Sequence, residues 1–193
     1  MMLGDNPGAK ATWQRIPKNS VGVELGVWKG NSSVLFLKRA KHLHLVDSYS
    51  PAPFQKSYDD QYLKKWYNKY SQLVGGNTEA DFKNYYNNLY EKVKKRFSNK
   101  PVTLHRKTTE DFFQTFNEKV DWIYVDADHG FEGCLQDLRN SIKIVKKGGY
   151  IFGDDYSDAK PGVKKAVDTF INETGLFLNN FYMDQFEIKV YDQ

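Results

Sequence analysis

Two short apolar runs in the second half of the chain each end in carboxylates, and a segment of helix length joins them. The first run is Asp121-Trp-Ile-Tyr-Val-Asp126-Ala-Asp128-His129, and the second is Gly148-Gly149-Tyr-Ile-Phe-Gly-Asp154-Asp155-Tyr156. This order predicts two parallel strands connected by a crossover helix. In open α/β sheets, ligands bind at the edge where the strands have their carboxyl ends. Residues 121–156 therefore predict both a unit of the fold and the place of a site.

Length and cysteine content limit the classes of protein to which the chain can belong. Its 193 residues suffice for one domain, residues 1–193, with a sizeable core. The longest apolar runs are far shorter than a membrane span and no secretory signal is evident, so we expect a cytoplasmic protein without a membrane partner. The single cysteine, Cys134, excludes an internal disulfide and cannot by itself form a zinc site. We expect it on the buried side of a helix.

The pattern along the chain predicts an α/β, Rossmann-like fold with a mostly parallel seven-stranded sheet, a C-terminal antiparallel hairpin and helices on both faces. The expected strands are 21–25, 42–47, 102–105, 121–126, 150–153, 176–183 and 186–191. The expected helices are 34–40, capped by Asn31 or Ser32; 58–73; 82–97; one capped by Thr109; 131–147, ending at Gly148; and one from Pro161 to Gly175. Residues 1–20 predict an irregular arm with at most a short helical turn at 13–16.

Residues 50–100 form a helical insertion with a distinct composition. Ten Lys or Arg and five Asp or Glu occur there, a local excess of +5 that accounts for the net charge of +4. One crossover helix would suffice between neighbouring strands, so the helix at 58–73 is a candidate lid. Its aromatic residues could stack on a sugar or aromatic acceptor, although a coding bias towards Lys, Asn, Tyr and Phe would also explain them. The charge excess is diffuse, so we do not expect a nucleic-acid partner.

The first half of the chain suggests a cofactor loop. A dinucleotide-binding loop requires G-x-G-x-x-G, but Trp28 occupies the second glycine position counted from Gly26, and no phosphate-binding loop of the Walker type occurs. What is present is Glu24-x-Gly26-x-x-x-Gly30, with Asp47 at the end of the next strand. A carboxylate in such a loop suits the sulfonium cation of S-adenosylmethionine (SAM) and would repel a pyrophosphate. The alternative is that Glu24 is a strand-end acid and that the glycines only form a turn.

These residues resemble the first motif of the class I SAM-dependent methyltransferases. The resemblance implies that Glu24, Gly26 and Gly30 form the loop around the methionine part of SAM. It further implies that Asp47 binds the ribose, that the adjoining Ser48 also contacts the cofactor, that Thr108 lies near the adenine, and that Asp126 lies beside the reacting methyl group.

The acids of the second half suggest a metal. Carboxylates at the ends of adjacent strands, about 4.8 Å apart, cannot all stay ionised unless they share a cation or take up protons. Oxygen ligands without thiolates favour magnesium, calcium or manganese over zinc. The alternative is a solvated turn at Asp154 and Asp155, with Asp126 bonded to backbone amides.

The pattern Asp126-x-Asp128-His129-x-Phe, followed by a helix, Gly-Gly, a strand and Asp154-Asp155-Tyr, is similar to the macrocin-type metal-dependent O-methyltransferases. This resemblance implies Asp126, Asp154 and Asp155 as ligands of Mg²⁺ or another hard divalent cation, and Asp128 as the general base. His129 is a second candidate for the base. Ala127 departs from the glycine usual in that family, and the region before the first strand is shorter than in its relatives.

The resemblance implies transfer of a methyl group from SAM to a hydroxyl of a small molecule or sugar. Two alternatives stay open: a nucleic-acid methyltransferase, although the chain lacks the Asn/Asp-Pro-Pro-Tyr/Phe motif of amino-methylating enzymes, and a non-catalytic module that binds SAM. The sequence does not define the acceptor, and it leaves a homodimer open.

Overall fold

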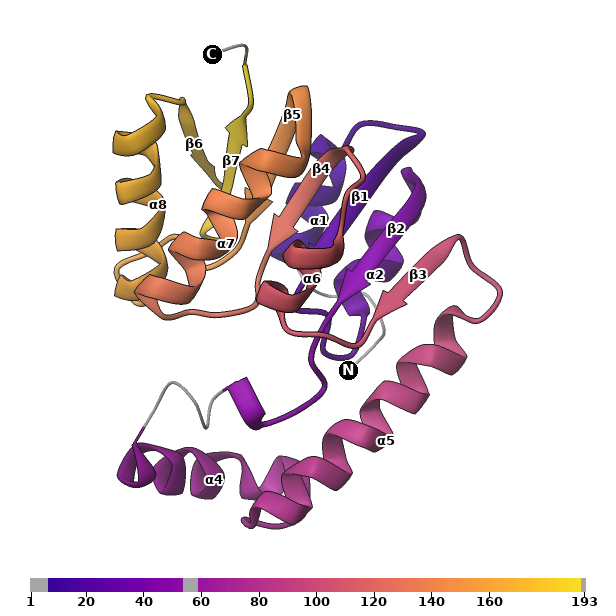
Figure 1. Ribbon diagram of the computed structural model, residues 1–193, viewed down its shortest axis with the longest axis vertical. Helices are drawn as coiled ribbons and strands as arrows, with labels where there is room; N and C mark the ends of the chain where they lie inside the picture. Colours follow the sequence, from indigo (N-terminus) through magenta and orange to yellow (C-terminus); the bar gives the residue numbers. More distant parts are fainter. Residues whose placement is uncertain (1–6, 54–58, 192–193) are drawn as a thin grey trace.

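The computed structural model describes residues 7–53 and 59–191, in which seven strands form one sheet in the order β3-β2-β1-β4-β5-β7-β6 (Figure 1). The strands β1 to β5 pair in parallel, whereas β7 pairs antiparallel with both β5 and β6. Their bounds are β1 Ser20–Leu25, β2 Ala40–Val46, β3 Val102–His105, β4 Val120–Val125, β5 Val145–Gly153, β6 Leu178–Phe181 and β7 Gln185–Lys189. The Rossmann-like sheet and its C-terminal hairpin are confirmed.

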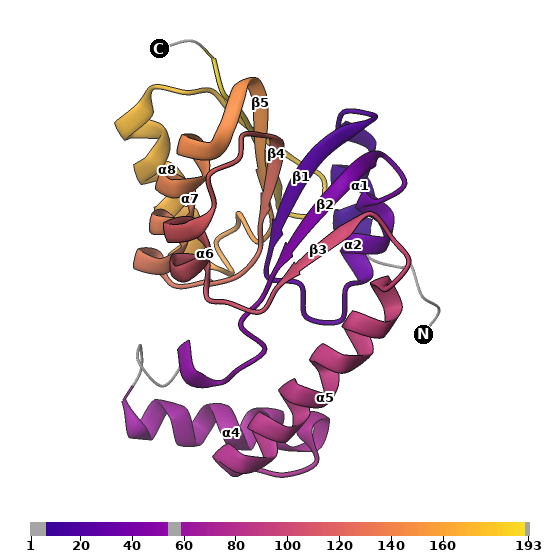
Figure 2. The same cartoon turned by 45° about the vertical axis from the view of Figure 1, so that its right-hand side comes forward.

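Helices cover both faces of this sheet. Those labelled in Figure 1 are α1 Pro7–Arg15, α2 Asn31–Phe36, α4 Asp60–Val74, α5 Glu79–Phe97, α6 Thr109–Thr115, α7 Phe131–Ile144 and α8 Pro161–Thr174. One apolar cluster joins the sheet to α6, α7 and α8, and a second joins the opposite face to α1, α2 and α5 (Figure 2). Within the described part of the chain, no helix is both long enough and apolar enough to span a bilayer.

The helices at 58–73 and 82–97 are confirmed as α4 and α5, and the glycines between them end the first helix. Gly75 caps α4 in a left-handed conformation, while Thr78 and Asp81 form a capping box at the start of α5. Helix α5 buries Phe82, Leu89, Val93 and Phe97, whereas α4 has no buried residue. In Figures 1 and 2 the hairpin of α4 and α5 extends from the side of the sheet on which the parallel strands end.

The N-terminal arm was predicted wrongly, because residues 7–15 form a helix. Pro7 begins α1, a position at which the missing amide hydrogen is not needed. Ala9, Thr12 and Ile16 are fully buried, and the Thr12 hydroxyl donates a 2.6 Å hydrogen bond to Gln185 Oε1 on β7. These contacts join residues that are far apart in the sequence, so local periodicity could not reveal them.

Three predicted helix ends also need correction. Helix α2 is preceded by Gly30 without a side-chain cap, so neither Asn31 nor Ser32 caps it. The cap of α6 is Thr108 rather than Thr109, because the Thr108 hydroxyl accepts the Asp111 amide. Helix α7 ends at Ile144, and Gly148 lies inside β5 with a φ of 77°. The lysines that suggested a longer helix belong to this strand, which pairs with β4 at Val145 on one side of them and at Tyr150–Gly153 on the other.

Candidate active site

The carboxyl ends of β1, β2, β4 and β5 bring most of the predicted site residues to one edge of the sheet. The Asp126 amide donates to Leu25 O (2.9 Å), the Gly26 amide to Val46 O (2.9 Å), and the Asp154 amide to Val125 O (3.3 Å). The loops that leave these strands therefore begin side by side. The predicted cofactor half and the predicted acid-rich half of the site are direct neighbours.

The loop after β1 approaches the end of β4 very closely. Gly26 has a φ of 84°, and a Cβ at this position would lie 1.9 Å from the carbonyl oxygen of Asp126. Only glycine meets both requirements. Trp28 has a φ of 47° and an exposed ring, so the large side chain at the second glycine position points outward rather than into the loop. The loop then enters α2 through Gly30, whose φ is 69°.

Glu24 is a buried acid beneath this loop. Its Oε2 accepts a 2.5 Å hydrogen bond from the Ser33 hydroxyl of α2. Burial raises the pKa of Glu24 to about 8, with further contributions from the nearby Asp126 and Asp47 carboxylates. Glu24 is therefore mostly protonated at neutral pH and ties β1 to α2 at the start of the site.

Asp47 follows β2 and organises two turns. Its Oδ2 accepts the amides of Val27 (3.0 Å) and Trp28 (2.9 Å), and its Oδ1 accepts the Tyr49 amide (2.7 Å). Burial raises the pKa of Asp47, although these amides oppose that effect. The carboxylate thus holds the glycine loop against the end of β2.

Two further residues of the predicted cofactor set lie near this edge but make only local contacts. Ser48 donates to Ser50 O at 3.4 Å. Thr108 begins α6 after β3, and its hydroxyl bonds the backbone and side chain of Asp111.

Asp126, His129 and Asp155 form a group whose ligand atoms all lie within 4.8 Å of one another. His129 Nε2 is 2.8 Å from Asp155 Oδ2 and 3.5 Å from Asp126 Oδ1, and Lys160 Nζ is 3.1 Å from Asp155 Oδ2. Hydrogen bonds to Asp126 and Asp155 raise the pKa of His129 to about 9, while burial raises the pKa of Asp126. The imidazole consequently carries a positive charge at neutral pH. This group differs from the predicted trio, because His129 stands in the place expected for Asp154.

Asp154 is turned towards Gln185, a residue that the sequence analysis missed. The Gln185 Nε2 donates to Asp154 Oδ1 and to Met183 O, and its Oε1 accepts from Thr12 and from the Tyr124 hydroxyl (3.1 Å). Gln185 is fully buried, so these bonds satisfy an amide that has no access to water. Burial and the neighbouring Asp126 raise the pKa of Asp154 to about 7. Gln185 was expected in a turn, and no short-range pattern points to partners on α1, β4 and β5.

Asp128 has a different environment from the other acids. It is exposed, and its Oδ1 accepts the Gly130 amide at 2.7 Å just before α7. A Cβ at Gly133 would lie 2.1 Å from Asp128 Oδ2, so the first turn of α7 leaves room for this carboxylate. Asp128 is therefore separate from the Asp126–His129–Asp155 group.

The order of the sheet, its C-terminal hairpin and the glycine loop at its carboxyl edge define the Rossmann-like fold of SAM-dependent methyltransferases. A family model described as a methyltransferase domain matches residues 23–156, a range that includes the glycine loop and Asp126, Asp128, Asp154 and Asp155. The chain belongs to this methyltransferase family.

Comparisons with individual proteins agree at the level of the fold. The chain resembles the O-methyltransferase NovP (TM-score 0.62, 18% identity, 96% of this chain and 79% of that chain). It also resembles a methyltransferase structure from Streptococcus mutans in complex with SAH (TM-score 0.58, 13% identity, 98% and 99%). In sequence, 59 residues are 36% identical to uncharacterized protein R132 of Acanthamoeba polyphaga mimivirus, which is 30% of this chain but only 27% of that protein. Structures named as an N-methyltransferase and an rRNA methylase share the fold, so the fold does not select the acceptor atom.

Proposed function

We propose that this methyltransferase moves the methyl group of SAM to a hydroxyl of a small molecule or sugar, with help from a divalent metal. The observation that carries the proposal is the Asp126–His129–Asp155 group directly beside the Gly26 loop. A cofactor loop and a pair of carboxylates, Asp126 and Asp155, that share one edge can hold a methyl donor and an acceptor hydroxyl next to each other. Such positioning is a large part of catalysis in a group transfer.

The proposed SAM-binding part of the site is built on the Gly26 loop, which Asp47 and Glu24 support. In the proposal, Gly26 and Gly30 let the backbone approach the methionine part of SAM, and the neutral Glu24 keeps α2 in place below it. Asp47, with Ser48, faces the ribose, and Thr108 at the start of α6 lies near the adenine. Asp126 adjoins both halves, since its backbone touches Gly26 and its side chain belongs to the acid group.

The chemistry of the acids fits a hard cation such as Mg²⁺. Carboxylate oxygens dominate the donor set, and burial raises the pKa values of Asp126 and Asp154, a cost of ionisation that a bound cation would offset. Asp126 and Asp155 would hold the cation, with Asp154 as the third ligand that the macrocin-type resemblance implies. A bound Mg²⁺ would supply Lewis-acid activation of the acceptor hydroxyl.

The remaining residues would position the acceptor and remove its proton. His129 is already engaged by two carboxylates, whereas Asp128 is exposed and has one oxygen committed to the Gly130 amide. We therefore assign Asp128 as the general base and His129 as a group that orients Asp126 and Asp155. Helix α4 remains the candidate lid for the acceptor.

The test measures methyl transfer from labelled SAM to a library of small-molecule and sugar hydroxyls, with Mg²⁺ and with EDTA. We expect transfer to require the metal and to fall by about 100-fold or more in Asp155→Asn. Asp158→Asn, which removes an exposed carboxylate from the same loop, is the matched control and should keep full activity. Binding of S-adenosylhomocysteine, followed by calorimetry, checks that each variant still holds the cofactor.

Three results would contradict parts of this proposal. Full activity in EDTA would show that methyl transfer does not require a metal. Cofactor binding without transfer to any hydroxyl would favour a non-catalytic module. Tight RNA or DNA binding that weakens steeply with salt would favour a nucleic-acid methyltransferase.

A further inference from the structure

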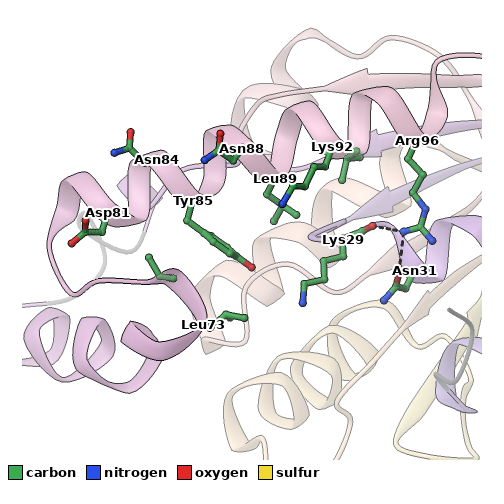
Figure 3. A pocket seen from close by; sticks show the side chains of 12 residues that line it. Lys29, Asn31, Leu73, Asp81, Asn84, Tyr85, Asn88, Leu89, Lys92 and Arg96 are labelled. Carbon is green, nitrogen blue, oxygen red and sulfur yellow. Dashed lines mark hydrogen bonds between the residues drawn. The ribbon is translucent and has the colours of Figure 1, made fainter. Parts of the chain in front are cut away.

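A pocket of about 600 Å³ lies on the inner side of α5, away from the acids after β4 and β5. It is an open pocket lined by α5, the C-terminal end of α4, and Lys29 and Asn31 at the start of α2 (Figure 3). Apart from Leu73 and Val74 at the end of the candidate lid α4, none of the residues assigned to the proposed methyl transfer lines it. It is therefore a separate feature of the molecule.

Three cations face this pocket without a carboxylate partner among the described residues. They are Lys29, Lys92 and Arg96. The Arg96 guanidinium is fixed by hydrogen bonds from Nη1 to Lys29 O (2.5 Å) and to Asn31 Oδ1 (3.0 Å), which Figure 3 shows as dashed lines. Burial lowers the pKa of Arg96, as expected for a guanidinium without a nearby counter-charge.

The carboxylate of Asp81 also borders the pocket but cannot neutralise these cations. Its Oδ2 is bonded to the Thr78 hydroxyl at 2.6 Å and to the Thr78 amide at 3.0 Å, within the capping box of α5. Asp81 lies in the first turn of α5, whereas Lys92 and Arg96 lie towards its other end in Figure 3. The end of the pocket near Arg96 is consequently positive.

The middle of the pocket is apolar and contains one unsatisfied polar atom. Leu73, Leu89 and Val93 form apolar walls. The Tyr85 ring extends from α5 towards Leu73 and Lys29 in Figure 3, and its buried hydroxyl has no hydrogen-bond partner within the described residues. A buried hydroxyl without a partner costs free energy, which a bound molecule could recover.

We propose that this pocket binds a small organic phosphate, with its phosphate between Lys29, Lys92 and Arg96 and its apolar part against Leu89 and Val93. A phosphate monoester offers up to two negative charges and three acceptor oxygens, which suits a fixed guanidinium flanked by two lysines. Tyr85 donates its hydroxyl hydrogen to a polar group of the ligand. This site does not depend on the proposed methyl transfer, because its residues and its ligand are different.

Calorimetric titration of the full chain with phenyl phosphate tests the proposal. We expect saturable binding that is at least ~10-fold weaker in Lys92→Gln, since one charge-assisted hydrogen bond is lost. Tyr85→Phe should weaken binding by ~3-fold or more for the same reason. Lys95→Gln removes a charge from the same helix outside the pocket and should leave the affinity unchanged.

Phenol, which has the ring without the phosphate, should bind at least ~10-fold more weakly than phenyl phosphate. The proposal is overturned if phenyl phosphate does not bind, if phenol binds equally well, or if Lys95→Gln weakens binding as much as Lys92→Gln. Competition by S-adenosylhomocysteine would also overturn it, because the phosphate would then occupy the cofactor edge. Circular dichroism of each variant verifies that the fold is retained.

Discussion

Gly26 shows how one residue can join two halves of a site. Its left-handed conformation turns the chain away from β1, and its lack of a side chain lets the carbonyl of Asp126 lie where a Cβ would be. Gly75 has nearly the same φ, 87°, but a Cβ there would meet nothing within 4 Å. Substitutions at Gly75 and Gly26 therefore distinguish the energetic cost of backbone strain alone from that of strain combined with steric overlap.

Gly75→Ala should lower the free energy of unfolding by about 1 kcal/mol, which is the strain of a left-handed alanine. Gly26→Ala should cost about 3–4 kcal/mol, because the new methyl group must also push β1 and β4 apart. Urea unfolding monitored by circular dichroism measures both values. Equal losses in the two variants would mean that the close contact with Asp126 is not important for stability.

Asp137 is a buried acid on α7 with an incomplete set of hydrogen bonds. It is 3% exposed, and its Oδ2 has no partner within the described residues. Burial raises its pKa to about 7, against the lowering effect of the Thr109 hydroxyl. A raised pKa means that the folded state binds the proton more tightly than the unfolded state, so this residue should make stability fall as pH rises from about 4 to about 7.

Asp137→Asn should therefore raise the free energy of unfolding at pH 8 by about 1–4 kcal/mol and have little effect at pH 4. Urea unfolding at both values of pH measures the difference. The exposed Asp158→Asn is the control and should change neither value by more than about 0.5 kcal/mol. A larger gain at pH 4 than at pH 8 would contradict the assigned direction of the pKa shift.

Elements with strong local signals were predictable from the sequence, and elements that depend on distant contacts were not. Pro161 and Gly175 mark the ends of α8, and the apolar spacing of α5 identifies its buried face. The helix α1 escaped detection because its buried residues contact distant parts of the chain, as Thr12 contacts Gln185 of β7. The sequence analysis placed the end of α7 too late, because the residues after Ile144 belong to β5, which pairs with β4. Local propensity is weak compared with such tertiary contacts.

Helix α4 should be the least stable helix of the described chain, because none of its residues is buried. Among the described residues, Trp66 and Tyr67 pack on Phe82 of α5, with ring centroids 4.7 Å apart in both pairs. Hydrogen exchange followed by mass spectrometry should show protection factors in α4 at least ~100-fold lower than in the second half of α5, where Leu89 and Val93 are buried. Equal protection in the two helices would show that α4 is held by the rest of the molecule.

At the scale of the whole molecule, contacts between α1 and the β6–β7 hairpin join two segments that are far apart in the sequence. Thr12 bonds Gln185, Arg15 lies 3.5 Å from Glu187, and the Arg15 guanidinium stacks 4.2 Å above the Phe181 ring. The same Gln185 holds Asp154 at the candidate active site. Helix α1 is therefore a structural part of the methyltransferase core rather than an appendage.

A chain that begins at Pro17 should lose about 3–6 kcal/mol of unfolding free energy, because Ile16 and Ala9 leave the core and Gln185 loses a buried partner. Thr12→Val removes only the hydrogen bond and should cost about 1–2 kcal/mol. Urea unfolding of the two variants provides the comparison. A truncated chain as stable as the full chain would show that the contacts of α1 contribute nothing.

The candidate site was predictable to the extent that strands carry their acids to a common edge. Glu24, Asp47, Asp126 and Asp155 all follow or end parallel strands, so the topology alone brings them together. The orientation of each carboxylate depends on neighbours from other parts of the chain. Asp154 accepts a hydrogen bond from Gln185, and His129 lies within reach of both Asp126 and Asp155. No spacing rule contains that information, because these neighbours are fixed only by the complete packing.

The hydrogen bond from Thr12 to Gln185 also has a consequence for biosynthesis. The two residues are separated by 173 positions, and the N-terminal end of a chain leaves the ribosome first. The contacts of α1 with β7 cannot form until β7 has been translated, so Thr12 stays without this buried partner while the strands and helices between them are made. Chaperones that shield nascent apolar surfaces would meet this chain with Ile16 still exposed.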